Sequence, residues 1–149
     1  MAKTTPAEAL TVERKRLVLD ANILIRGCLG LRVKCLIATY ADQVDFYVAE
    51  SNVTEAAHYI AELAKKKRLD VITCTDTLLS LMQIVQQMGD TMLESAREEA
   101  LTRIRDPNDW QALALALQLE CAIWTEDQDF FGTGIATWTT NTVEIYLKS

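Results

Sequence analysis

The stretch Leu17-Val18-Leu19-Asp20-Ala21-Asn22 decides the fold, because three consecutive apolar residues run directly into a carboxylate. Continuous apolar character, without alternating polar residues, is typical of a strand that is buried on both faces. Such strands occur in parallel sheets that helices cover on both sides. Ligands of open parallel α/β sheets bind beyond the carboxyl ends of the strands. The position of Asp20 after this strand therefore makes it the first candidate for a functional site.

Strands and helices are expected to alternate along the rest of the chain. The sequence predicts further strands over 46–48, 71–73, 121–125 and 135–138. It predicts helices over 22–40 with an interruption near 27–30, 52–67, 76–104 with a break near 89–90, and 110–119. Asp106 fits the N-cap, and Pro107 the first position, of the helix that leads to 119. Thr139 is expected to cap a last helix that ends at 147. This order predicts an α/β fold, with a central parallel sheet of about five strands flanked by helices on both faces.

Length and composition favour one globular domain. The chain has 149 residues, of which 50% are hydrophobic and 24% are charged. We expect a flexible leader over 1–16 and a single domain over 17–149. The longest uncharged runs, 77–89 and 130–143, fall short of the roughly 18 apolar residues of a membrane span. The sequence therefore predicts a cytoplasmic protein with no membrane association.

Charge and residue counts exclude several classes of function. Fifteen Lys and Arg against 21 Asp and Glu give a net charge of −6, which argues against a nucleic-acid binder that relies on bulk positive charge. The four cysteines form no CxxC pair, and His58 is the only histidine. A zinc site built from Cys and His is therefore not expected, nor is a mechanism that needs several histidines.

Acidic residues recur at the predicted carboxyl edge of the sheet. They follow the first strand, the second strand and the fourth strand, and one begins the helix before the fourth strand: Asp20, Glu55, Asp109, Asp127 and Asp129. Each also has a purely structural interpretation. Asp20 can cap a helix, Asn52 and Glu55 resemble a capping box, and an acid in the first turn suits the helix dipole at Asp109. The segment Asp127-Gln128-Asp129 can be a polar turn.

Taken together, the acids favour a metal site over helix capping. Four or five carboxylates at one edge repel one another and raise each other's pKa, and a bound divalent cation removes that penalty. Ligand sets made only of oxygen favour Mg²⁺ or Mn²⁺ over zinc or copper. Among the basic residues, Arg26 lies one helical turn after Asn22 and is the preferred contact for a phosphate group.

The chain resembles the PIN-domain nucleases, in particular the compact bacterial VapC-type toxins of toxin–antitoxin pairs. The resemblance extends from Leu17 to about Leu147. Asp109 precedes Thr125 by 16 residues and Asp127 by 18, similar to the interval in the family. Four segments carry the resemblance: the opening stretch 17–22, the helical Glu55, the segment Asp106-Pro107-Asn108-Asp109-Trp110, and the segment Thr125-Glu126-Asp127-Gln128-Asp129-Phe130.

This resemblance implies residue roles. The acidic quartet is Asp20, Glu55, Asp109 and Asp127, with Asn22 and Thr125 as supporting residues. Asp129 competes with Asp127 as the fourth acid and is a further candidate metal ligand, Glu50 competes weakly with Glu55, and Glu126 is expected to point away from the site.

The resemblance also implies an activity and partners. The activity is a metal-dependent endoribonuclease that hydrolyses RNA phosphodiester bonds with Mg²⁺ or Mn²⁺. The partners are an RNA substrate, a cognate antitoxin protein and a second copy of the chain in a homodimer.

Two alternative functions remain open at this point. One is a non-catalytic PIN-like module that binds RNA or a protein partner without cleavage. The other is a haloacid dehalogenase-like phosphatase, in which an aspartate also follows a buried strand. That family requires an acid two residues after the nucleophile, where this sequence has Asn22.

Overall fold

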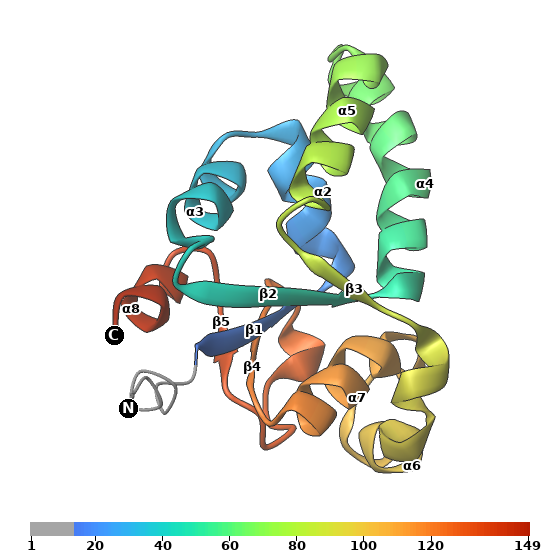
Figure 1. Cartoon of the computed structure of the whole chain (residues 1–149). Helices are drawn as coiled ribbons and strands as arrows, with labels where there is room; N and C mark the ends of the chain where they lie inside the picture. The colour runs from blue at the N-terminus through green and yellow to red at the C-terminus, as the bar shows by residue number, and fades with distance from the viewer. Residues whose placement is uncertain (1–13) are drawn as a thin grey trace.

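The computed structural model describes residues 14–149 and contains one parallel sheet with helices on both faces (Figure 1). The strands are β1 (Lys15–Leu19), β2 (Val44–Ala49), β3 (Gln86–Met88), β4 (Ala122–Trp124) and β5 (Thr137–Trp138). The helices are α2 (Ala21–Leu29), α3 (Arg32–Tyr40), α4 (Glu50–Lys66), α5 (Val71–Leu81), α6 (Glu94–Arg103), α7 (Trp110–Leu119) and α8 (Val143–Lys148). Three short 3-10 helices are η1 (Asp90–Leu93), η2 (Pro107–Asp109) and η3 (Gln128–Phe130).

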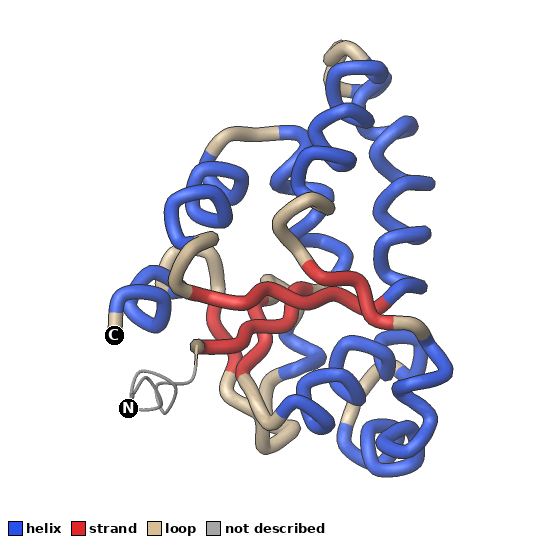
Figure 2. The backbone as a smooth tube through the Cα atoms, viewed as in Figure 1, coloured by secondary structure: helices blue, strands red, loops and turns tan. Residues whose placement is uncertain are grey.

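The five strands lie in the order β3-β2-β1-β4-β5, and every neighbouring pair is parallel. Figure 2 shows the strands together in the middle of the molecule with helices above and below them. The predicted α/β class and the parallel five-stranded sheet are confirmed.

The opening stretch is buried on both faces, as its continuous apolar character predicts. Leu17 and Leu19 belong to the core between the sheet and α2, α3, α4, α5 and α8. Val18 points to the other core, which α6 and α7 cover. All three side chains have 0% exposure. Strand β1 also lies at the centre of the sheet, so its carboxyl end opens onto the middle of that edge.

The prediction of a strand over 71–73 is wrong, because these residues begin helix α5. Their β-branched side chains favour a strand locally, but Cys74, Leu78 and Leu81 lie on one helical face that is buried in the core. Tertiary packing outweighs the local preference here. The third strand is instead the segment Gln86–Met88, within the region 76–104 that was predicted to be helical.

Several boundaries also differ from the prediction. Strand β1 begins at Lys15, so the last two residues of the predicted leader belong to the sheet, while 1–13 lie outside the described residues. Thr139 does not cap the last helix, since α8 begins at Val143. The Thr139 carbonyl instead accepts hydrogen bonds from the backbone N–H groups of Thr142 and Val143. No helix of residues 14–149 has the length and apolar character to cross a membrane.

Candidate active site

Four acidic side chains line one small hollow at the carboxyl edge of the sheet. Asp20 follows β1, Glu55 lies in α4 directly after β2, Asp109 ends η2 at the start of α7, and Asp127 follows β4. The hollow has a volume of about 20 Å³, comparable to the space that one water molecule or small cation occupies. The structure thus brings together all four members of the predicted quartet, although Asp109 comes 89 positions after Asp20 in the sequence.

Asp20 is fixed by hydrogen bonds to both of its carboxylate oxygens. Oδ1 accepts from the backbone N–H of Asn22 at 2.6 Å, which makes Asp20 the N-cap of α2. Oδ2 accepts from the hydroxyl of Thr125, a residue with no exposed surface. Asp20 therefore caps α2, as its structural interpretation predicts, and it also lines the hollow.

Thr125 links Asp20 to the loop after β4. Its Oγ1 accepts a hydrogen bond from the backbone N–H of Asp127 at 2.9 Å while it donates to Asp20. Asp127 in turn accepts from the backbone N–H of Asp129 at 2.9 Å, so it caps η3. One buried hydroxyl thus joins the Asp20 carboxylate, which follows β1, to the backbone of Asp127 in the loop after β4.

Burial, together with the charges of neighbouring acids, raises the pKa of two residues in the hollow, Asp20 and Asp109. Burial raises the pKa of Asp20 from 3.8 to about 6, and the charge of Asp127 raises it further, while the hydrogen bonds from Thr125 and Asn22 act in the opposite direction. Burial also raises the pKa of Asp109 to about 7, assisted by the charges of Asp127 and Asp106. The residues that line the hollow are all described, and none of them is Lys or Arg. A cation from solution would offset this repulsion.

Glu55 and Asn22 reach the hollow from the solvent side, since both are exposed. The interpretation of Asn52 and Glu55 as a capping box is wrong, because α4 begins at Glu50 and Ala49 is its N-cap. Helix α4 starts immediately after β2, and Glu55 therefore lies inside the helix, on its second turn. Glu50 does not line the hollow.

Asp129 belongs to a second group of acids beside the hollow. Carboxylate oxygens of Asp106, Asp109 and Asp129 lie within 4.8 Å of one another. Asp106 caps η2 by accepting from the backbone N–H of Asn108 at 3.0 Å, as its sequence context predicts. Asp109 is common to both groups, whereas Asp129 does not line the hollow and Asp127 does.

Arg26 faces a neighbouring groove, not the acidic hollow. It is exposed on α2 and lines a groove of about 650 Å³ together with Arg32 and Lys67. Glu126 lies on the same groove, where its Oε2 accepts from the backbone N–H of Thr140 at 2.7 Å. Glu126 therefore points away from the quartet, as strand alternation predicts.

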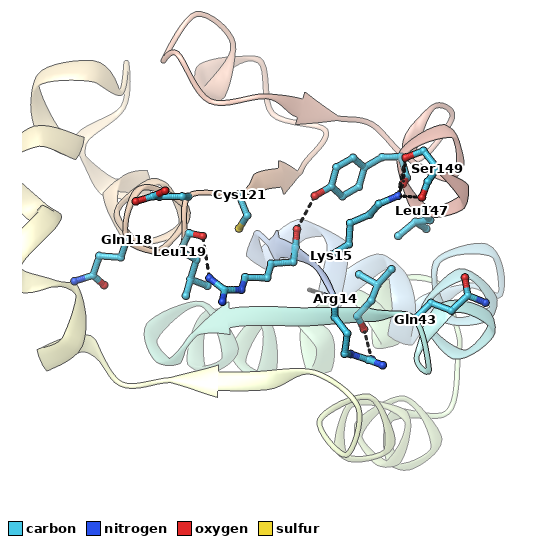
Figure 3. Close-up of a pocket in the computed structure, with 12 residues that line it drawn as sticks. Arg14, Lys15, Gln43, Gln118, Leu119, Cys121, Leu147 and Ser149 are labelled. Carbon is cyan, nitrogen blue, oxygen red and sulfur yellow. Dashed lines mark hydrogen bonds between the residues drawn. The ribbon is translucent and has the colours of Figure 1, made fainter. Parts of the chain in front are cut away.

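A second large groove of about 630 Å³ lies at the opposite, amino-terminal edge of the sheet (Figure 3). The basic side chains that line this groove donate hydrogen bonds to other groups of the protein. Arg14 donates to Asp45 and to backbone carbonyls of the α3–β2 turn, and Lys15 donates to the Tyr146 carbonyl at 2.6 Å. Arg16 donates to the Leu119 carbonyl at 3.3 Å. These contacts tie strand β1 to its neighbours and contribute nothing to the acidic hollow.

One polar residue of the hollow was missed by sequence reasoning. Asn52 is buried with 7% exposure and lines the hollow one helical turn before Glu55. Its spacing of three residues from Glu55 places both on one face of a helix, and this was the available signal.

The parallel sheet and the acidic hollow at its carboxyl edge can be compared with those of known protein families. The sequence profile of the PIN domain matches residues 18–148, and the chain therefore belongs to the PIN-domain family. This membership sets aside the phosphatase alternative. Members of the family are generally nucleases. No curated protein sequence matches the chain significantly.

Three solved structures share the fold at low sequence identity. The chain is similar to PAE2754 from Pyrobaculum aerophilum, with 16% identity and a TM-score of 0.66 over 90% of this chain and 96% of that chain. It is similar to VapBC2 from Rickettsia felis bound to a DNA fragment from their promoter, with 12% identity and a TM-score of 0.60 over 83% and 98% of the respective chains. For FitAcB from Neisseria gonorrhoeae the identity is 20% and the TM-score 0.54, over 83% and 97%.

Proposed function

We propose that the protein is a metal-dependent endoribonuclease of PIN type, which hydrolyses phosphodiester bonds in RNA. The observation that carries this proposal is the convergence of Asp20, Glu55, Asp109 and Asp127 on one hollow. Helix capping alone does not require four carboxylates from separate elements to meet at one place. Nuclease activity of this kind needs no histidine base, which suits a chain with a single histidine.

The donor set of the hollow fits Mg²⁺ or Mn²⁺. Its polar side chains offer only carboxylate and carboxamide groups, and hard divalent cations prefer such oxygen ligands. Asp20, Glu55, Asp109 and Asp127 would hold the ion. When bound, a divalent cation supplies a nucleophilic water at neutral pH and neutralises charge that develops on the phosphate.

The remaining residues have supporting roles in this proposal. Thr125 orients Asp20 through its hydroxyl, and Asn22 presents its exposed side chain at the mouth of the hollow. Asp127 is the preferred fourth acid over Asp129, because Asp127 lines the hollow. Arg26, with Arg32 and Lys67 on the adjoining groove, would contact the phosphates of the RNA backbone and provide local positive charge on an acidic protein.

The biological role that we propose is the toxin of a toxin–antitoxin pair. Membership of the PIN-domain family and the similarity in fold to VapBC2 and FitAcB support this role. A cognate antitoxin would bind the protein and block the acidic hollow. We further propose a cytoplasmic homodimer.

The proposal is tested by incubating labelled RNAs of mixed sequence and structure with the purified protein and Mn²⁺ or Mg²⁺. We expect cleavage that a chelator abolishes and that Asp20→Asn abolishes without loss of the fold. Asp76→Asn, which removes an exposed carboxylate of α5, is the matched control and should cleave normally. Cleavage by Asp20→Asn would contradict the assignment. A folded protein without cleavage and without metal binding would favour the non-catalytic binding module.

A further inference from the structure

Asn52 is the one residue around the hollow whose polar side chain is both buried and incompletely satisfied. Its exposure is 7%, and its Oδ1 has no hydrogen-bond donor. Asn52 lies in the first turn of α4, three residues before Glu55, so the two side chains share one face of the helix. Both residues line the acidic hollow.

The surroundings of Asn52 explain what kind of partner is missing. Buried polar atoms are normally hydrogen-bonded, and an acceptor without a donor is unfavourable. The acidic neighbours of Asn52 in the hollow are carboxylates, which accept hydrogen bonds but do not donate them when ionised. The backbone N–H of Asn22, another residue that lines the hollow, is already bonded to Asp20. An amide oxygen in this position is therefore suited to a positively charged partner from solution.

We infer that Asn52 is a neutral oxygen ligand for the divalent cation of the hollow and completes the coordination provided by the acids. This inference rests on the proposed function, because it requires the metal site. Amide carbonyl oxygen is a hard ligand of the type that Mg²⁺ and Mn²⁺ accept. A neutral ligand also adds no further negative charge to a site where four carboxylates already repel one another.

The neighbouring residue provides a matched control. Ser51 also has a buried side-chain oxygen, Oγ, without a hydrogen-bond partner. Ser51 does not line the hollow. If Asn52 binds the metal, its substitution should weaken Mn²⁺ binding and substitution of Ser51 should not. If unsatisfied polar groups in α4 have only a general structural role, the two substitutions should have similar effects on Mn²⁺ binding.

The test is a titration of the metal-free protein with Mn²⁺ alone. Binding is detected by calorimetry or by the loss of the electron paramagnetic resonance signal of the free ion. The thermal midpoint Tm of each metal-free variant is measured in parallel. Asn52→Leu is expected to weaken Mn²⁺ binding by about tenfold or more. Removal of a residue that only hydrogen-bonds a metal ligand already costs about tenfold or more, and loss of a ligand should cost at least as much. Its metal-free Tm is expected to equal or exceed that of the wild type, because the unsatisfied oxygen is gone. Ser51→Ala is expected to bind Mn²⁺ like the wild type.

Two further variants complete the design. Asn52→Asp keeps an oxygen ligand, so its Mn²⁺ affinity is expected to stay within about threefold of the wild type or to increase. This change is smaller than the roughly tenfold loss of affinity that follows removal of a residue supporting a metal ligand. Asn52→Ala decides the question if the larger leucine disrupts packing, and it is expected to weaken Mn²⁺ binding as well.

Unchanged Mn²⁺ affinity in Asn52→Leu or Asn52→Ala would overturn the inference while leaving the acidic metal site intact. A lowered Tm with unchanged affinity would identify Asn52 as a purely structural residue. If the wild type binds no Mn²⁺, the metal site of the proposed function is contradicted, and this inference falls with it.

Discussion

Replacing Asp20 by Asn should stabilise the metal-free protein at neutral pH, although the same change should remove its activity. Asp20 is buried, and its pKa is raised from 3.8 to about 6. The folded protein therefore binds this proton more tightly than the unfolded chain does. Ionisation of Asp20 lowers the free energy of unfolding as pH rises from about 4 to about 6, and the loss is complete above that range. Asn at this position does not ionise.

The magnitude follows from the shift in pKa and from the hydrogen bonds of Asp20. A shift from 3.8 to about 6 corresponds to about 3 kcal/mol at pH 7.5. An amide has one acceptor oxygen, so Asp20→Asn loses one of the two bonds from Asn22 and Thr125, at a cost of about 1 kcal/mol. The net gain is about 2 kcal/mol, and this raises Tm by roughly 4–8 °C for a chain of this size.

The assay is thermal unfolding in a chelating buffer at pH 4 and pH 7.5. We expect Asp20→Asn to be more stable than the wild type at pH 7.5 and to lose that advantage at pH 4, where the wild-type carboxyl is protonated. The exposed control Asp76→Asn should show no such dependence. A lower stability of Asp20→Asn at pH 7.5, or the same difference between the two proteins at both pH values, would show that ionisation of buried Asp20 does not destabilise the fold.

Three more outcomes are expected. Mn²⁺ or Mg²⁺ at 100 times its dissociation constant should stabilise the wild type by about 3 kcal/mol in thermal unfolding, whereas Asp109→Asn should need much more ion for the same shift. Thr125→Val removes the hydroxyl that joins Asp20 and Asp127, so it should cost about 1–3 kcal/mol of stability and slow cleavage; a fully active variant would contradict the orienting role. Asp127→Asn should lose metal binding in a titration while Asp129→Asn retains it, and the reverse result would exchange the two assignments.

The sequence predicts the centre of the sheet better than its margins. Leu17-Val18-Leu19 and the segment ending at Trp124 are buried on both faces, and burial of this kind requires apolar residues that a reader of the sequence can recognise. Strand β3 has no such signal, because Gln86 and Gln87 are exposed at the edge of the sheet. Val71 and its neighbours were misleading, since the buried face of α5 depends on contacts with helices that lie elsewhere in the sequence.

The candidate site could be predicted for a related reason. Asp20, Asp109 and Asp127 follow strands or begin helices, and those positions are visible locally in the sequence. The relation between Asp127 and Asp129 is different, because both lie in one loop and only the folded chain shows which of them lines the hollow. The sequence shows the spacing of Asn52 from Glu55 but not its place in the hollow, because its burial and its missing hydrogen bond depend on all surrounding groups.

The most direct test of the central claim is the cleavage rate of one RNA under single-turnover conditions in Mn²⁺, measured for the wild type, Asp109→Asn and Asp106→Asn. The last variant is a close control, because Asp106 is a neighbouring carboxylate that does not line the hollow, and Asn can replace it as a helix cap. If the hollow is the nuclease centre, Asp109→Asn should reduce the rate by about 100-fold or more, and Asp106→Asn should change it little. Equal rates for the wild type and Asp109→Asn would contradict the account.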